Sequence, residues 1–275
     1  MTKTILITGS SSGFGKATAL RFHSAGWNVV ATMRDTAAWA EAPSDRFFPI
    51  PLDVTDPVSI RGAFDAGIQQ FGHIDAVANI AGVGLFSVFE TTTEQTVRSV
   101  FETNLFGPME IIRVAIPHLR ANGGGNIINL TSASSMVPEP LMAVYSASKA
   151  ALDNFTEAVR FELAPQNIVV SLIEPGFVPT TGLVGKLWAG QADLVIPLEY
   201  QEIAQRRMAF FSSEPTVDLA TADDVAGAIL ASIDDKSGRL RWVVGADQDE
   251  RMRMRHETSE ADYIAWSWNT FAPAI

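Results

Sequence analysis

The chain has 275 residues and a formal net charge of -11 at pH 7; 47% of its residues are hydrophobic and 19% are charged. This composition is that of a globular chain, and the acidic balance argues against general nucleic-acid binding because an acidic surface repels phosphate backbones. The chain has no cysteine, which excludes disulfides, thiolate zinc sites and cysteine catalysis.

The sequence gives no sign of a membrane, export or metal site. No apolar run approaches the roughly 20 residues that span a bilayer, and the short apolar run at the N-terminus ends too early for a signal peptide. The four histidines are scattered, without the spacing of metal ligands. We therefore expect a cytoplasmic protein with no membrane span and no metal.

A short buried strand followed at once by a glycine-rich turn is the first predicted element. Residues 4–8 are apolar or β-branched, and residues 16–25 have helical composition. Glycines between a strand and a helix let the backbone approach a pyrophosphate, and the helix N-terminus supplies N–H donors. A simple strand–helix loop is the alternative interpretation. The candidate phosphate-binding residues are Gly9, Ser11, Ser12, Gly13, Phe14 and Gly15.

The second predicted strand, residues 28–33, ends where a dinucleotide fold meets the adenosine ribose. An Asp or Glu there would accept from both ribose hydroxyls and repel a 2′-phosphate, but this chain has Met33 followed by Arg34. A guanidinium can pair with a phosphate through two hydrogen bonds. We predict that NADP(H) is preferred over NAD(H), and a solvated surface arginine is the alternative.

Strands and helices alternate along the rest of the chain. Strands are predicted at 73–78, 126–131, 167–173 and 240–244, with helices at 57–71, 93–119, 143–162 and 221–233. This alternation predicts parallel strands with the ligand at their carboxyl ends. We expect one Rossmann-type, doubly wound α/β domain over residues 1–245, with about seven parallel strands and helices on both faces. Residues 246–275 would be a C-terminal extension that packs on the body or on a partner subunit.

Tyr145 and Lys149 lie four residues apart in the helix predicted at 143–162. That spacing puts both side chains on one helix face, about 5–6 Å apart at Cβ. An ammonium beside a phenol favours the phenolate and brings a pKa of about 10 closer to what a general acid or base needs at neutral pH. Ser132 follows the strand at 126–131, at the edge where catalytic groups gather. Asn104 is polar in an otherwise apolar helix; a local kink is the alternative explanation.

The stretch from residue 177 to about 198 is more apolar than a plain surface loop. We interpret it, as part of a substrate loop that extends to about residue 215, as a lid over an apolar pocket. A docking surface for another subunit is the alternative. In the extension, the aromatic residues predict packing, and Arg251, Arg253 and Arg255 are interpreted as a solvated face.

Together these motifs resemble the classical short-chain dehydrogenase/reductase family over about residues 3–245. The resemblance rests on Thr8-Gly9-x-x-x-Gly13-x-Gly15, Asn79-x-Ala81-Gly82, Asn104, Ser132, Tyr145-x-x-x-Lys149, and Pro175-Gly176 with Thr180, which occur in the family's order. Ile80 replaces the second Asn of the usual Asn-Asn-Ala-Gly, and Ser135 stands where many members have Gly.

The resemblance implies roles for the matched residues. Tyr145 would be the general acid/base, and Lys149 would lower the phenol pKa and bind the nicotinamide ribose. Ser132 would hold the substrate carbonyl, and Asn104 would position a water that links Lys149 to solvent. The other implied cofactor contacts are Asp53, Val54, Asn79, Ala81, Gly82, Pro175, Gly176, Val178 and Thr180, and the candidate substrate contacts are Ser134, Phe177, Leu187 and Trp188.

The resulting expectation is an NADP(H)-dependent oxidoreductase that interconverts a carbonyl and a secondary alcohol on a hydrophobic small molecule. The family also implies a homodimer or homotetramer. Two alternatives remain open: a non-catalytic NADP-binding module that recognises a protein partner, and an epimerase or dehydratase on the same fold.

Overall fold

A parallel sheet of seven strands forms the centre of the protein. The strands are β1 (Thr4–Ile7), β2 (Asn28–Met33), β3 (Phe47–Pro51), β4 (Ala76–Asn79), β5 (Gly125–Leu130), β6 (Ile168–Pro175) and β7 (Arg241–Val244). Their order in the sheet is β3-β2-β1-β4-β5-β6-β7, and all neighbours are parallel. The computed structural model describes residues 2–39, 44–179, 196–212 and 217–271. The predicted Rossmann-type fold is confirmed.

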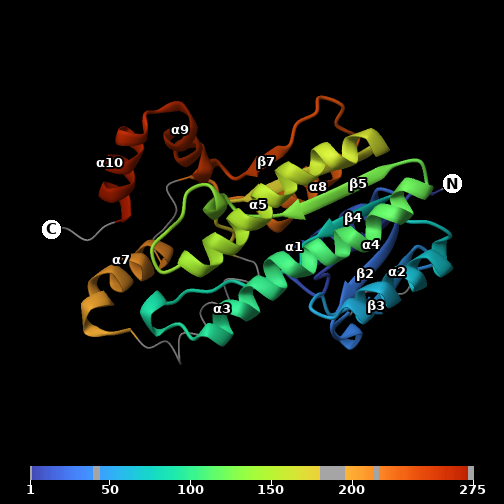
Figure 1. Ribbon diagram of the computed structural model, residues 1–275, viewed down its shortest axis with the longest axis horizontal. Coiled ribbons are helices and arrows are strands. Elements are labelled where there is room, and N and C mark those ends of the chain that lie inside the picture. Colours follow the sequence, from blue (N-terminus) through green and yellow to red (C-terminus); the bar gives the residue numbers. More distant parts are fainter. Residues whose placement is uncertain (1, 40–43, 180–195, 213–216, 272–275) are drawn as a thin grey trace.

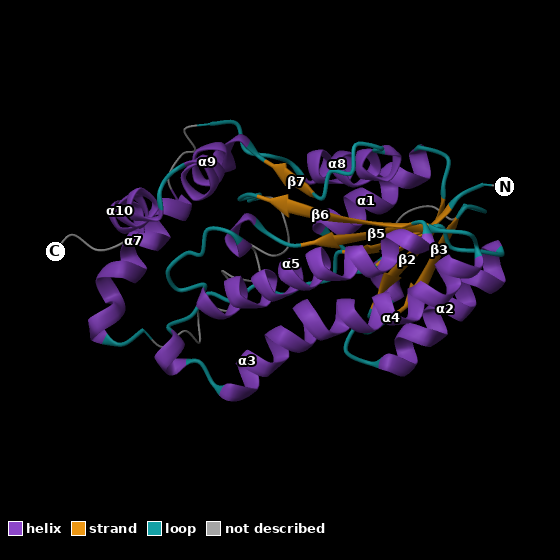
Figure 2. Cartoon of the chain, turned by 45° about the horizontal axis from the view of Figure 1, so that its top comes forward, coloured by secondary structure: helices purple, strands orange, loops and turns teal. Residues whose placement is uncertain are grey.

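Helices cover both faces of this sheet. The α-helices of the described residues are α1 (Gly13–Ser24), α2 (Pro57–Phe71), α3 (Glu94–Phe101), α4 (Gly107–Ala121), α5 (Ala143–Leu163), α7 (Gln201–Ser212), α8 (Ala222–Asp234), α9 (Asp249–Glu257) and α10 (Glu260–Phe271). Figure 2 shows the sheet nearly edge-on, with α1 and α8 over one face and α2, α4 and α5 over the other.

The two layers have separate hydrophobic cores because side chains alternate between the faces of a strand. In β1, Ile5 and Ile7 pack with Phe22 of α1, whereas Leu6 packs with Ile111 of α4. All of these side chains are fully buried. Burying one such side chain contributes roughly 1.5–3 kcal/mol, so these central strands anchor the turns that follow them.

Helix boundaries follow capping chemistry. The Asp56 side chain accepts a hydrogen bond from Val58 N at the start of α2, and Thr221 and Asp224 form a reciprocal capping box at the start of α8. Both starts confirm the sequence prediction. The stretch predicted as one helix at 93–119 is helical without a break. Its middle, η3 (Glu102–Phe106), is a π-helical segment that joins α3 to α4.

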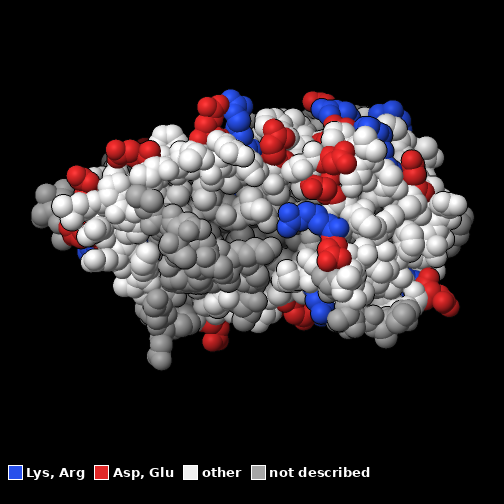
Figure 3. Space-filling model, turned by 90° about the horizontal axis from the view of Figure 1, so that it is seen from below, with Lys and Arg blue, Asp and Glu red and all other residues white. Residues whose placement is uncertain are grey.

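The carboxyl ends of the strands point toward α7, α9 and α10, and the N-terminus lies at the opposite end of the molecule (Figure 1). On the face seen in Figure 3, the described basic side chains lie singly or in small groups, several of them beside acidic ones. Among the helices of the described residues, none combines the length and the apolarity that crossing a bilayer requires.

Candidate active site

One large cavity opens at the carboxyl ends of the strands, where a doubly wound sheet binds its ligand. Its volume is about 1030 Å³, and its walls come from the turns after the strands, from the start of α5 and from α9 and α10. The predicted residues that line it are Gly9, Ser11, Ser12, Gly13, Phe14, Gly15, Arg34, Asp53, Val54, Ala81, Gly82, Ser132, Ser134, Tyr145, Lys149, Pro175, Gly176, Phe177 and Val178.

The glycine turn after β1 is packed too closely for side chains. Gly9 has a φ of 73°, and a Cβ on it would lie 2.9 Å from the Ala81 Cα. A Cβ on Gly15 would lie 2.2 Å from the Gly9 carbonyl oxygen. The Thr8 hydroxyl oxygen accepts hydrogen bonds from the backbone N–H groups of Ile80 and Ala81, at 2.9 and 3.0 Å. These bonds hold the turn after β4 against the glycine turn.

The start of α1 fits a dinucleotide pyrophosphate. Ser12 is the N-cap, yet its side chain makes no capping hydrogen bond. Gly13 has a φ of 54°, and the backbone from Ser11 to Gly15 lines the cavity. The first N–H groups of a helix have no partner within the helix, and they carry the positive end of its dipole. These residues are therefore the candidate cradle for the phosphate oxygens of a cofactor.

The part of the cavity predicted to bind adenosine contains a cation and a carboxylate. Met33 is buried at the end of β2, and Arg34 is exposed at the cavity wall. The Asp53 carboxylate accepts hydrogen bonds from the backbone N–H and the hydroxyl of Thr55, at 2.9 and 2.8 Å. These bonds lower the pKa of Asp53, and the Arg34 guanidinium lowers it further. Arg34 therefore lies close enough to Asp53 to act on its charge.

Ser132, Tyr145 and Lys149 meet in the same cavity from two elements. Ser132 follows β5 and caps the short turn η4 (Ala133–Ser135), while Tyr145 and Lys149 lie one turn apart on α5. Lys149 Nζ donates to the Leu130 carbonyl at 2.9 Å. Lys149 also lies beside Gly82, since a Cβ on that glycine would come within 3.4 Å of Nζ.

Burial has the largest effect on the pKa values of Tyr145 and Lys149. It raises the pKa of the Tyr145 phenol, which the hydrogen bond with Ser132 lowers only in part. It also lowers the pKa of Lys149 to about 8. The pKa of Tyr145 is raised, whereas the sequence analysis expected Lys149 to lower it. The cost of burying a charged phenolate outweighs the stabilisation by its polar contacts. At neutral pH the phenol therefore holds its proton.

Asn104 lies in the π-helical segment η3 and is fully buried. Its Oδ1 accepts from Val83 N at 2.8 Å, and its Nδ2 donates to Val83 O at 2.9 Å and to Ser148 Oγ at 3.0 Å. The amide thus fastens the turn after β4 to α5. A π-turn inserts an extra residue into a helix and is frequent at functional sites. The Gly82 Cβ position is 3.3 Å from Asn104 Oδ1, so Asn104 and Lys149 face the same point.

Four predicted residues fall outside this arrangement. Asn79 is buried in the sheet, where its Nδ2 donates to Asn129 Oδ1 at 2.8 Å, and it does not line the cavity. Thr180, Leu187 and Trp188 lie outside the described residues, as does most of the apolar stretch interpreted as a lid.

The extension after β7 supplies part of the cavity wall. The apolar side chains that line the cavity together with Phe177 include Met142, Val217, Leu219 and Trp266. Glu139, in the loop before α5, forms buried ion pairs with Arg207 of α7 and Arg251 of α9. The Phe271 ring lies 5.5 Å from each guanidinium. The prediction of a solvated face is therefore wrong for Arg251, because Glu139 draws it into the interior.

Asp247 contributes a contact that no local motif indicates. Its Oδ2 accepts from the backbone N–H of Phe177 at 3.1 Å, and a Cβ on Gly176 would lie 2.5 Å from its Oδ1. Glycine at 176 therefore lets the carboxylate approach the turn after β6. The contact spans 70 residues of sequence.

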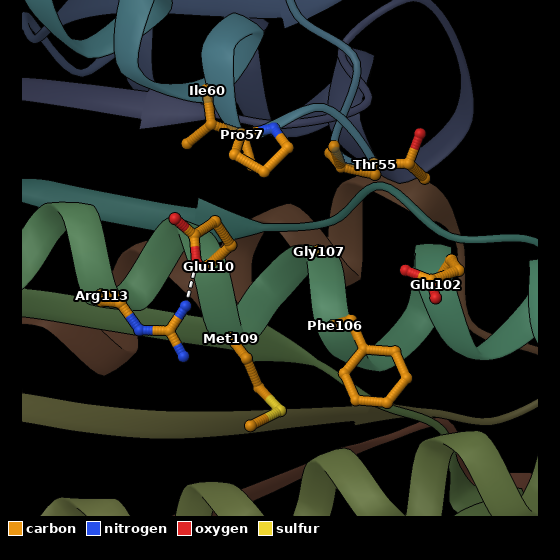
Figure 4. A pocket seen from close by; sticks show the side chains of 10 residues that line it. Thr55, Pro57, Ile60, Glu102, Phe106, Gly107, Met109, Glu110 and Arg113 are labelled. Carbon is orange, nitrogen blue, oxygen red and sulfur yellow. Dashed lines mark hydrogen bonds and ion pairs between the residues drawn. The ribbon is translucent and has the colours of Figure 1, made fainter.

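A smaller hollow of about 190 Å³ lies between the start of α2 and the segment joining η3 to α4 (Figure 4). Pro57, Phe106 and Met109 contribute to its lining, and its Glu110 and Arg113 side chains are paired with each other. Because Glu110 neutralises the charge of Arg113, this hollow is a weaker candidate for binding a phosphate than the start of α1.

Comparison with known proteins agrees with this geometry. The family model for the short chain dehydrogenase matches residues 3–192. An uncharacterized oxidoreductase of Methylorubrum extorquens is 34% identical over 252 residues, which cover 88% of this chain and 94% of that protein. The crystal structure of a short-chain dehydrogenase from Streptomyces avermitilis has a TM-score of 0.82 at 28% identity and covers 100% of this chain and 99% of its own.

Similar folds have been solved with either cofactor. A short chain dehydrogenase/reductase from Burkholderia phymatum in complex with NAD has a TM-score of 0.78 at 27% identity, with 93% of each chain covered. Another from Burkholderia cenocepacia, in complex with NADP, shares the fold at 24% identity and a TM-score of 0.76, covering 99% of this chain and 98% of its own. With its sheet, glycine turn and matched length, the chain belongs to the short-chain dehydrogenase family of oxidoreductases.

Proposed function

We propose that this protein is an NADP(H)-dependent oxidoreductase that interconverts a carbonyl and a secondary alcohol. The observation that carries the proposal is the convergence of Ser132, Tyr145 and Lys149 in the cavity that the glycine turn of β1 also lines. The catalytic part is residues 1–245, and the extension 246–275 completes the substrate wall. The apolar lining by Met142 and Trp266 supports a hydrophobic substrate.

In the proposed reduction, the side chains handle the charge that develops on the substrate oxygen. A nicotinamide cofactor, when bound, would supply a hydride, which is one proton with two electrons, to the carbonyl carbon. Ser132 and Tyr145 donate hydrogen bonds to the carbonyl oxygen, and Tyr145 gives up its proton as the alkoxide forms. The raised pKa of Tyr145 keeps this proton in place at neutral pH until the oxygen becomes basic.

Lys149 stabilises the phenolate that remains. Its pKa of about 8 leaves it charged at neutral pH, and its bond to the Leu130 carbonyl fixes the position of Nζ. In our proposal Lys149 also binds the nicotinamide ribose. Asn104 links the turn at Val83 to Ser148, next to this lysine, and would position the water that returns a proton.

The preference for NADP(H) rests on Arg34 and Met33. The ribose end has a guanidinium at the wall, and Met33 offers no carboxylate to accept from the ribose hydroxyls. Arg34→Ala is expected to weaken NADP binding about tenfold, equal to about 1.4 kcal/mol, and to change NAD binding less than twofold. Fluorescence titration of both cofactors measures this.

A matched control for that variant is Arg98→Ala. Arg98 is exposed, pairs with Glu94 on α3, and is not among the residues that line the cavity. Its removal should leave both affinities unchanged. Equal losses for NADP and NAD in Arg34→Ala would contradict a contact with the 2′-phosphate.

We also propose a homodimer or homotetramer that forms through the helices carrying Asn104 and Tyr145. Phe106 in η3 is 50% exposed and Phe161 on α5 is 69% exposed, which supports an apolar contact surface. Phe161→Glu is expected to shift the protein to a monomer of 29.7 kDa in sedimentation velocity at micromolar concentration. Phe89→Glu, at a residue 67% exposed outside these helices, is the control and should keep the parent size.

A parent protein that already sediments as a monomer would refute this assembly. The cytoplasm, which supplies reduced nicotinamide cofactors, is the location we propose.

A further inference from the structure

Glu174 is a carboxyl group at the centre of the fold that the proposed chemistry does not use. It lies near the end of β6, directly before Pro175 and Gly176, and it is 0% exposed. In the described structure, no N–H or hydroxyl group of another residue donates a hydrogen bond to either of its carboxyl oxygens. An ionised carboxylate without donors in such a place costs several kcal/mol, so a protonated group is favoured.

Among the described residues, the Arg241 guanidinium is the positive charge nearest to three carboxyl groups, those of Asp153, Glu157 and Glu174. Arg241 of β7 donates from Nη2 to Asp153 Oδ1 at 2.6 Å and to Glu157 Oε2 at 2.7 Å, and its Nε lies 3.4 Å from Glu174 Oε1. Asp153 and Glu157 come from α5. Three ionised carboxylates around one positive charge would leave an excess of two negative charges, mostly in the interior.

The three carboxyl groups differ in their access to donors and water. The Glu157 side chain is 48% exposed, so water supports its charge. Asp153 accepts from Arg241 and from the Ser135 hydroxyl at 3.3 Å. Burial, a hydrogen bond with Asp153 and repulsion by the Asp153 charge together raise the pKa of Glu174 to about 8, and the Arg241 guanidinium opposes them only in part. Glu174 is therefore the member that keeps a proton.

We propose that Glu174 is held protonated, that it donates its proton in a hydrogen bond to Asp153, and that this buried pair positions the segments that carry the catalytic groups. Ser135 ties Asp153 to the turn that Ser132 begins. Asp153 lies two helical turns after Tyr145 and one after Lys149.

The pair thus joins three parts of the site: the Ser132 turn, the catalytic face of α5, and the Pro175-Gly176 turn. Its catalytic consequence rests on the proposed function, whereas the protonated state can be tested without substrate. Many family members have glycine where this chain has Ser135. The Ser135 hydroxyl donates to Asp153 and so links the pair to the turn that begins at Ser132.

The first test measures stability against pH in the wild type and in Glu174→Gln. The amide of glutamine donates to Asp153 at every pH, whereas Glu174 must lose a proton as pH rises. The carboxyl pKa is 4.5 without the fold's influence and about 8 in the fold. Between these values the unfolded chain releases the proton and the folded chain retains it, so the stability of the wild type falls as pH rises.

The thermal midpoint of the wild type should therefore fall by several degrees relative to Glu174→Gln between pH 5 and pH 8. Groups common to both proteins, Lys149 included, cancel in this difference. Glu157→Gln removes the solvated carboxylate on the same arginine, and its curve should run parallel to that of the wild type. Parallel curves for wild type and Glu174→Gln would overturn the protonated pair.

The second test separates positioning from packing. At pH 6, Glu174→Ala should lower kcat for carbonyl reduction about tenfold while the KM for NADPH stays within about twofold, since misplacing catalytic groups slows chemistry more than it weakens binding. Glu174→Gln should restore kcat. An unchanged kcat in Glu174→Ala would refute the positioning role. If the wild type reduces no carbonyl, the proposed function fails, and the stability curves still decide the state of the pair.

Discussion

Tyr145→Phe is expected to lower kcat for carbonyl reduction roughly 10²- to 10⁴-fold and to leave NADPH binding unchanged, because only the proton donor is removed. The Tyr145 ring packs with Phe86 and Met142, and phenylalanine keeps these apolar contacts. Ser132 and the Lys149 ammonium remain in place and still polarise the carbonyl. Stopped-flow reduction with NADPH and a fluorescence titration of the cofactor separate turnover from binding.

Tyr200→Phe is the matched control. Its hydroxyl donates to Glu90 at the protein surface, and the residue does not line the cavity. This variant should turn over at the parent rate. A Tyr145→Phe protein that reduces carbonyls as fast as the parent would show that another group delivers the proton.

Gly15→Ala is expected to weaken NADPH binding about a hundredfold, or about 2.7 kcal/mol, and to destabilise the fold by about 1–3 kcal/mol. The added methyl would lie 2.2 Å from the Gly9 carbonyl oxygen and 2.6 Å from its carbon. Both atoms belong to the backbone of the turn, so a side-chain rotation cannot relieve the clash. The turn must therefore open, and the backbone N–H groups at the start of α1 then no longer point toward one phosphate position.

Gly62→Ala tests whether the effect comes from the clash. Gly62 also lies in a helix, α2, and a Cβ there would meet nothing within 4 Å. Alanine should stabilise that helix by about 0.5–1 kcal/mol and leave NADPH binding unchanged. Urea unfolding and the same titration measure both quantities. Equal behaviour of the two variants would remove the steric basis for the cradle.

The strands were predictable because a strand buried on both faces of a parallel sheet is a short apolar run. The prediction for β2, residues 28–33, matches the observed bounds, and that for β1 differs by one residue. Capping residues made the starts of α2 and α8 predictable in the same way. These signals are local, since each element carries its own boundary chemistry in neighbouring residues.

The principal site motifs were predictable for a related reason. A glycine turn sits between consecutive elements, and Tyr145 and Lys149 are one helical turn apart. The sheet topology then brings these local motifs to one edge, where they line the cavity. The placement of Asn104 in a π-turn was not predictable, because the extra residue is accommodated only by the packing of η3 against its neighbours.

Contacts between distant residues were missed. Glu139 pairs with arginines that are 68 and 112 residues away, and Arg241 reaches carboxyl groups on α5 and β6. The strand predicted to end at residue 173 continues to Pro175, so Glu174 becomes an interior residue. No pattern in the neighbouring sequence indicates which arginine a buried carboxyl group will meet, since the fold alone determines the pairing.

The ion pairs of Glu139 have a consequence for protein engineering. The residues proposed to hold the cofactor phosphates come early in the chain, whereas Trp266 and Thr270 add to the cavity wall after β7. The extension is joined to the loop before α5 through Arg251, which also contacts the Phe271 ring. A foreign extension that keeps an arginine at this position would bring new side chains to the cavity. In the proposed enzyme, substrate choice would then be altered by exchanging the extension alone, without changes to the residues proposed as catalytic.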